Sequence, residues 1–208
     1  MIAVQAWSPD SGCLATGNGR GMLKLRTVEG GGATQAIEAH KAAIRSLLWS
    51  RNGQQLASCG EDGTVRIWDR ATGKELMKLD CAISSNPGRR GVPPQVGNLA
   101  WSSNGDRLAV AEDIGVIRIW DTSSQQVVHT MHGHNGPAGL AWNPKFERLA
   151  SATKDVIKIW DTATGQELVT FPQQTNPGGI GASTALPVSW STDGWRLEVS
   201  GTVWDATP

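Results

Sequence analysis

The most informative stretch of this sequence is Val65-Arg66-Ile67-Trp68-Asp69, because close copies of it recur along the chain. The copies read Ile117-Arg118-Ile119-Trp120-Asp121 and Ile157-Lys158-Ile159-Trp160-Asp161. Apolar and basic residues alternate in each copy, which is the period-two pattern of a strand with one buried face. The sequence therefore predicts a repeated β-strand that ends in Trp-Asp.

A second repeated phrase precedes the first, and in it a tryptophan is followed seven residues later by a leucine. The pairs are Trp7 and Leu14, Trp49 and Leu56, Trp101 and Leu108, Trp142 and Leu149, and Trp190 and Leu197. Asn-Gly or Asp-Gly lies between the two residues at 52–53, 104–105 and 193–194. Such pairs supply the positive φ of a tight hairpin turn, so each phrase predicts two strands joined by a turn.

Each copy is completed by apolar runs on either side of these phrases. One apolar run follows each Trp-Asp strand, at 75–79, 127–131 and 167–171. Another run ends at the tryptophan that opens the second phrase of a copy, as residues 44–49 do at Trp49. The copies then hold four short strands each, except that the fifth and shortest copy ends just after its third strand. We expect an all-β chain of repeats at roughly 1–39, 40–82, 96–132, 133–172 and 186–208.

Four strands per copy and a Trp-Asp ending resemble the WD40 repeat family. The resemblance covers nearly the whole chain. It implies a β-propeller, in which four-stranded antiparallel blades stand around a central channel. About five blades are expected here. The family also implies a non-catalytic surface for protein partners.

Blades of this family carry a buried polar tetrad of His, Ser or Thr, Asp and Trp, and the resemblance places two complete sets here. The expected tetrads are His40, Ser58, Asp62 and Trp68 in the second copy, and His134, Ser151, Asp155 and Trp160 in the fourth. Indole, hydroxyl, imidazole and carboxylate would form one hydrogen-bonded chain. The third copy has Val110 at the hydroxyl position, and the first has Arg20 and Arg26 where Asp and Trp belong.

Composition excludes several classes of function. Lys plus Arg equals Asp plus Glu at 19 each, so no net charge draws the chain to nucleic acid or to membranes. The three cysteines have no metal-site spacing and their odd number argues against a disulfide framework, so we expect a reducing compartment, the cytoplasm. The start of the chain does not read as a signal peptide, and no apolar run is long enough to span a bilayer.

Catalysis and cofactors are not expected. Ser, His and Asp occur together, but their order and spacing match the tetrad and the set recurs, which a nucleophile would not require. His129, His132 and His134 do not suggest a metal site, because further ligands with suitable spacing are lacking and His134 is already assigned to a tetrad. Enzyme activity is the least favoured function, and an architectural domain within a larger signalling protein is the alternative to a protein-binding scaffold.

Two long connections, 80–96 and 172–187, are the expected binding surface, because both follow the outermost strand of a blade. Arg89 and Arg90 in the first connection are the candidate partner contacts. Five blades are fewer than the seven common in the family. The chain is then a fragment, a propeller completed by another copy or chain, or a five-bladed ring, and we expect one of the first two.

Overall fold

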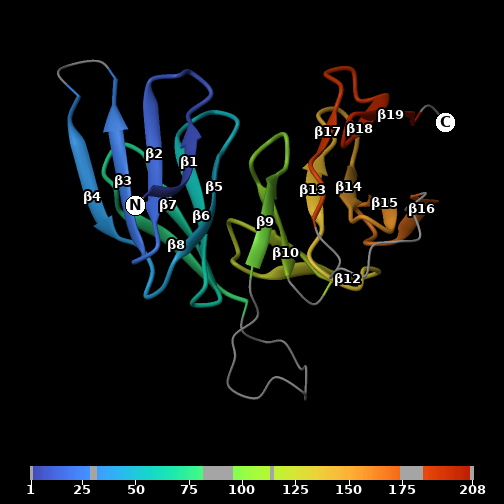
Figure 1. The fold of residues 1–208 in the computed structure, drawn as a ribbon, viewed down its shortest axis with the longest axis horizontal. Coiled ribbons are helices and arrows are strands. Elements are labelled where there is room, and N and C mark those ends of the chain that lie inside the picture. The colour runs from blue at the N-terminus through green and yellow to red at the C-terminus, as the bar shows by residue number, and fades with distance from the viewer. Residues whose placement is uncertain (1, 29–31, 82–95, 113–114, 174–184, 207–208) are drawn as a thin grey trace. The chain divides into compact units, whose positions relative to one another are not determined.

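The computed structural model describes residues 2–28, 32–81, 96–112, 115–173 and 185–206, and every regular element in these ranges is a β-strand (Figure 1). The strands form five separate antiparallel sheets in chain order. The chain divides into two compact units, which comprise Met1–Leu99 and Ala100–Pro208. None of the described segments is a helix that could cross a membrane. The all-β fold predicted from the repeats is confirmed.

The first unit contains two four-stranded sheets whose strands pair in chain order. The first sheet consists of β1 (Ile2–Trp7), β2 (Cys13–Asn18), β3 (Met22–Thr27) and β4 (Thr34–Glu38). The second sheet consists of β5 (Ile44–Trp49), β6 (Gln55–Gly60), β7 (Thr64–Asp69) and β8 (Glu75–Asp80).

The second unit contains three sheets, and the strand β9 carries the boundary between the units. The third sheet consists of β9 (Val96–Trp101), β10 (Arg107–Glu112), β11 (Val116–Asp121) and β12 (Val127–His132). The fourth consists of β13 (Gly139–Trp142), β14 (Arg148–Ala152), β15 (Val156–Asp161) and β16 (Glu167–Pro172). The fifth has three strands, β17 (Val188–Trp190), β18 (Arg196–Val199) and β19 (Thr202–Asp205).

Strand register explains the spacing of the repeated tryptophan and leucine. In the second sheet Trp49 lies opposite Leu56, and Leu56 lies opposite Trp68. Because residues directly opposite each other share a face of a sheet, the three side chains form one apolar row across three strands. The turn between the first two strands closes at Gly53, whose φ is 68°. The Asn-Gly signal in the sequence is thereby explained.

Consecutive sheets within a unit bury the row of one sheet against the next. Ala15 and Leu25 of the first sheet belong to the same core cluster as Trp49, Leu56 and Trp68 of the second. Burying aromatic and aliphatic side chains between two sheets is the dominant favourable contribution to this kind of packing. The cores therefore lie between the sheets.

A hydrogen bond from a tryptophan to the main chain accompanies this packing. The Trp49 indole N–H donates to the Ala6 carbonyl at 3.0 Å, and the Trp190 indole N–H donates to the Ala141 carbonyl at 3.1 Å. In both cases the acceptor is the residue immediately before the equivalent tryptophan of the preceding sheet. The same contact thus ties the second sheet to the first and the fifth to the fourth.

Candidate functional site

The second sheet holds the polar chain expected from the sequence. The Trp68 indole N–H donates to Ser58 Oγ at 2.9 Å, and Ser58 Oγ lies 2.7 Å from His40 Nε2. His40 Nδ1 lies 3.0 Å from Asp62 Oδ1. Because a carboxylate only accepts, His40 Nδ1 carries the proton and Nε2 accepts from the serine hydroxyl. The structure brings all four residues together.

Asp62 is the residue on which the chain ends, and it accepts several further hydrogen bonds. The Lys41 N–H donates to Oδ2 at 3.0 Å, and the Thr64 hydroxyl donates to Oδ1 at 2.8 Å. Burial would raise the pKa of Asp62, but the donors from Lys41, Thr64 and His40 outweigh it and lower the pKa to about 2. Burial also lowers the pKa of His40, although Asp62 opposes that shift. At neutral pH a charged carboxylate therefore holds a neutral imidazole.

The fourth sheet forms only part of the same chain, which corrects the expectation for Asp155. The Trp160 indole N–H donates to Ser151 Oγ at 2.8 Å, and Ser151 Oγ lies 2.7 Å from His134 Nε2. Asp155 is exposed and makes no hydrogen bond to His134. His134 Nδ1 is buried and has no partner among the residues that the structure describes. The set in this sheet is a triad.

A shorter hairpin explains why Asp155 does not reach the imidazole. Trp160 follows Ser151 by nine residues, whereas Trp68 follows Ser58 by ten. The turn of the second sheet contains Gly63 at a φ of 75°, and the fourth sheet has no residue in its place. The Thr153 N–H instead donates to the Val156 carbonyl at 3.0 Å, which closes a tighter loop with Asp155 at its tip.

The third sheet replaces the polar chain with a buried ion pair that the sequence reasoning did not predict. Val110 stands at the hydroxyl position, and the Trp120 indole nitrogen has no partner among the described residues. Glu112, whose side chain is fully buried, pairs with Arg118. Gly60 holds the position of Glu112 in the second sheet.

The position of Gly60 shows why Glu112 and a tetrad histidine do not occur together. A Cβ atom at Gly60 would lie 2.5 Å from His40 Nδ1, so a side chain there and the imidazole exclude each other. A glutamate at this position, in a copy without the histidine, is the signal that could have predicted the ion pair. The pairing matters because a buried carboxylate without a counter-charge is strongly unfavourable.

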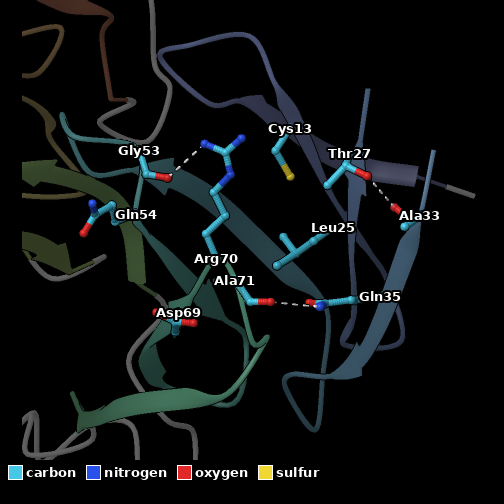
Figure 2. A pocket seen from close by; sticks show the side chains of 10 residues that line it. All are labelled: Cys13, Leu25, Thr27, Ala33, Gln35, Gly53, Gln54, Asp69, Arg70 and Ala71. Atoms are coloured by element: carbon cyan, nitrogen blue, oxygen red, sulfur yellow. Dashed lines mark hydrogen bonds between the residues drawn. The ribbon is translucent and has the colours of Figure 1, made fainter. Parts of the chain in front are cut away.

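A groove in the first unit lies beside β3 and the turn that follows β7, and it has a volume of about 390 Å³ (Figure 2). We call it the β3–β7 groove. It is lined by Cys13, Leu25, Thr27, Ala33, Gln35, Gly53, Gln54, Asp69, Arg70 and Ala71. The Cys13 and Leu25 side chains in it are buried to 99 % and 97 %. This volume is within the usual range for sites that take a small ligand or a few side chains.

Fixed polar groups surround the apolar part of the groove, as Figure 2 shows. Arg70 Nη1 donates to the Gly53 carbonyl at 3.3 Å, as drawn in Figure 2. The same nitrogen donates to Asp10 Oδ2 at 2.7 Å. The Gln35 amide donates to the Ala71 carbonyl at 3.3 Å. These contacts hold the guanidinium and the amide at the edge of the groove.

The equivalent position in the third sheet explains why this groove is open. Arg107 takes the place of Cys13, and its Nη1 donates to the Thr162 carbonyl of the fourth sheet at 2.9 Å. The small Cys13 side chain cannot reach across in this way. The groove therefore follows from one small residue at a position where a long one can bridge two sheets.

Arg89 and Arg90 lie outside the described residues. His134 Nε2 is used by Ser151, and His129 Nε2 lies 3.1 Å from the Ala163 carbonyl. The described part of the chain contains no cluster of three or more His, Cys, Asp or Glu residues arranged to hold a metal ion.

Comparisons with known proteins give one family and several partial relatives. The family model described as the β-propeller of nucleolar protein 10-like proteins, N-terminal domain, matches residues 5–185. Polyadenylation factor subunit 2 of Cryptococcus neoformans is 26 % identical over 131 residues, which cover 63 % of this chain and 17 % of the relative. The WD repeat-containing protein slp1 of Schizosaccharomyces pombe is 29 % identical over 145 residues, or 69 % of this chain and 27 % of the relative.

A third relative has the same partial character. Periodic tryptophan protein 2 of Arabidopsis thaliana is 29 % identical over 151 residues, which cover 72 % of this chain and 16 % of the relative. The matched regions thus span between 16 % and 27 % of the length of these three relatives.

Proposed function

Because this chain belongs to the WD40-repeat β-propeller family, and to the nucleolar protein 10-like N-terminal domains within it, we propose that it is a non-catalytic scaffold that presents a rigid surface to a protein partner. Propellers with WD repeats are in general interaction scaffolds. The β3–β7 groove is the observation that carries the proposal for this chain. It combines an apolar interior with donors held in place by neighbouring residues.

The groove suits one apolar side chain of a partner with an acceptor beside it. Leu25 and Cys13 line the apolar part of the groove, although they are themselves almost fully buried, and burying a Leu, Val or Phe side chain of the partner contributes about 1.5–3 kcal/mol. Arg70 has five N–H donors, and Asp10 and Gly53 occupy Nη1 alone. A carboxylate or carbonyl of the partner would therefore meet a guanidinium that is already oriented.

The buried tetrad supports a structural role for the residues that resemble a catalytic set. Ser58 is fully buried, and its oxygen already accepts the Trp68 indole N–H. A nucleophile must be open to its substrate and must be deprotonated by its base. Ser58 fails the first requirement because it is fully buried, and His40 Nε2 serves to orient its hydroxyl.

We also propose that Arg89 and Arg90 contact the protein partner, because arginine side chains form charge-assisted hydrogen bonds with acidic groups. The cytoplasm remains the proposed location, supported by Cys13, Cys59 and Cys81, which are buried as thiols. Burial raises the pKa of the Cys59 thiol to about 12, which makes it unreactive.

The experiment that tests the scaffold is crosslinking and affinity capture with the complete chain. Ala33→Phe fills the groove, and Ala163→Phe places the same side chain on an exposed turn of the fourth sheet as a matched control. We expect the groove variant to lose at least about tenfold in partner affinity, and the control to bind as the natural chain does.

Arg89→Ala with Arg90→Ala tests the loop contact in the same assay. Capture that survives both sets of changes would refute these two surfaces. If no specific partner is captured by the natural chain, the architectural alternative replaces the scaffold.

A further inference from the structure

The face of the first sheet that carries Trp7 is open. Trp7 is 54 % exposed, whereas the equivalent Trp49 is 6 % exposed because it packs on the first sheet. Val28 on the same face is also exposed. A hollow of about 360 Å³ lies there, lined by Trp7, Leu14, Arg26, Thr27, Val28 and Gly32. We call this surface the Trp7 face.

The Trp7 face also carries a net positive charge, because two basic residues share it with a single acid of the same sheet, Glu38, which lies opposite Met22. Residues Lys24 and Arg26 alternate with buried residues along β3 and point to this side. In the second sheet the basic residue Arg66 pairs with Glu75 of the outer strand at 2.6 Å. Thr34 stands at the corresponding position in the first sheet, opposite Arg26. Among the described residues of this face, one cation is therefore in excess, next to the exposed indole of Trp7.

The fifth sheet presents a second open face with complementary chemistry. Ser189 lies opposite Glu198, and Glu198 lies opposite Val203, so the three residues share one side of the sheet. Val203 is 62 % exposed, and Glu198 is exposed as well. Arg196 and Asp205 lie opposite each other on this side and offset each other in charge. Among the described residues of this side, the carboxylate of Glu198 is then in excess. We call this surface the Val203 face.

Junctions between consecutive sheets show which positions of the two faces would meet. In three junctions within the units, an alanine of one sheet shares a core cluster with a tryptophan of the next. The pairs are Ala15 with Trp68, Ala109 with Trp160, and Ala150 with Trp204. Glu198 occupies the alanine position of the fifth sheet, and Arg26 occupies the tryptophan position of the first. An apolar pair is thus replaced by an acid and a base.

We propose that the Val203 face of one chain docks on the Trp7 face of a second copy. Glu198 pairs with Arg26, Val203 enters the hollow beside Trp7, and the Trp7 indole N–H donates to the Ser189 carbonyl. That last bond would repeat the contacts of Trp49 with Ala6 and of Trp190 with Ala141. The second copy is the occupant that the charges favour, because each face carries the charge that the other lacks. Since the two faces differ, the association is head to tail.

A charge-swap experiment on the complete chain tests this proposal. Molar mass is measured by light scattering and by sedimentation over a hundredfold range of concentration. We expect the natural chain to reach the mass of a dimer or more, and Arg26→Glu and Glu198→Arg each to raise the dissociation constant on the order of tenfold or more. The double variant should regain association. Arg51→Glu, an equal change of charge on an exposed turn, is the matched control and should associate normally.

Each of these measurements can overturn the proposed contact. A natural chain that stays monomeric throughout would overturn the proposal, as would two reversals whose effects add and are not rescued together. Circular dichroism of each variant separates loss of association from loss of fold. Association that is unchanged in both single variants would place the contact elsewhere.

Discussion

The second and fourth sheets have the same histidine, serine and tryptophan, and they differ in how the hydrogen-bonded chain ends. In the second sheet His40 Nδ1 meets Asp62, and in the fourth His134 Nδ1 has no partner among the described residues. The difference arises from one residue in the hairpin, because the second sheet has Gly63 and the fourth lacks its counterpart. A complete motif in the sequence is therefore not sufficient for a complete network. The length of the turn decides it.

Removing each aspartate should give the largest contrast between the two sheets. Asp62→Ala leaves the His40 imidazole, the Lys41 N–H and the Thr64 hydroxyl without their acceptor, so we expect a loss of about 2–3 kcal/mol in the free energy of unfolding. Asp155→Ala should change that free energy by less than about 0.5 kcal/mol, since the residue is exposed. Denaturant unfolding measures both. Equal losses in the two variants would show that Asp155 completes the network after all.

The response to acid should separate the two sheets next. Burial, with a smaller effect of the Lys158 charge, lowers the pKa of His134 to about 4. The unfolded chain therefore binds a proton near pH 6.5 that the folded chain refuses until about pH 4. Stability contributed by the neutral imidazole is present above pH 6.5 and is lost as the pH falls toward 4, by up to about 1.4 kcal/mol per pH unit.

Unfolding measured at intervals between pH 7 and pH 4 checks this dependence. His134→Gln should make it shallower, because the variant lacks the buried imidazole whose pKa falls to about 4. Asp62 behaves differently, since its pKa of about 2 keeps its contribution intact above pH 3.8 and the loss is confined to lower pH. A His134→Gln variant with an unchanged pH profile would contradict the assignment.

Restoring the missing residue should have the smallest effect. A glycine inserted between Asp155 and Val156 lengthens the hairpin to that of the second sheet, which allows the carboxylate to reach His134 Nδ1. We expect a gain of about 1 kcal/mol, the usual net contribution of one hydrogen bond. The same insertion combined with Asp155→Ala is the control and should give no gain. The pKa of His134, followed by NMR, should rise in the insertion variant alone.

The strands and their pairing could be predicted from the sequence because they depend on local signals. The alternation in 65–69 gives the face of the strand, and the Asn-Gly at 52–53 gives the turn that sets the register. The tetrad of the second sheet followed from the same motif. These features need only the spacing of residues within one repeat.

The wrong prediction for Asp155 and the missed ion pair of Glu112 have a different origin. Both depend on the path of a hairpin and on the volume left by a neighbouring side chain, which a residue motif does not encode. The β3–β7 groove belongs to the same class, because it arises from Cys13 and the sheet beside it. Comparing the lengths of the turns between copies would have identified the first of these, since 151–160 is one residue shorter than 58–68.

The indole bonds of Trp49 and Trp190 have a consequence for how such repeats diverge. Their acceptors are the main-chain carbonyls of Ala6 and Ala141, and every amino acid supplies a carbonyl. Substitutions at the acceptor position therefore leave the link between neighbours available. Repeats joined in this way can lose most of their shared residues one by one and still stack, provided that each keeps its own tryptophan.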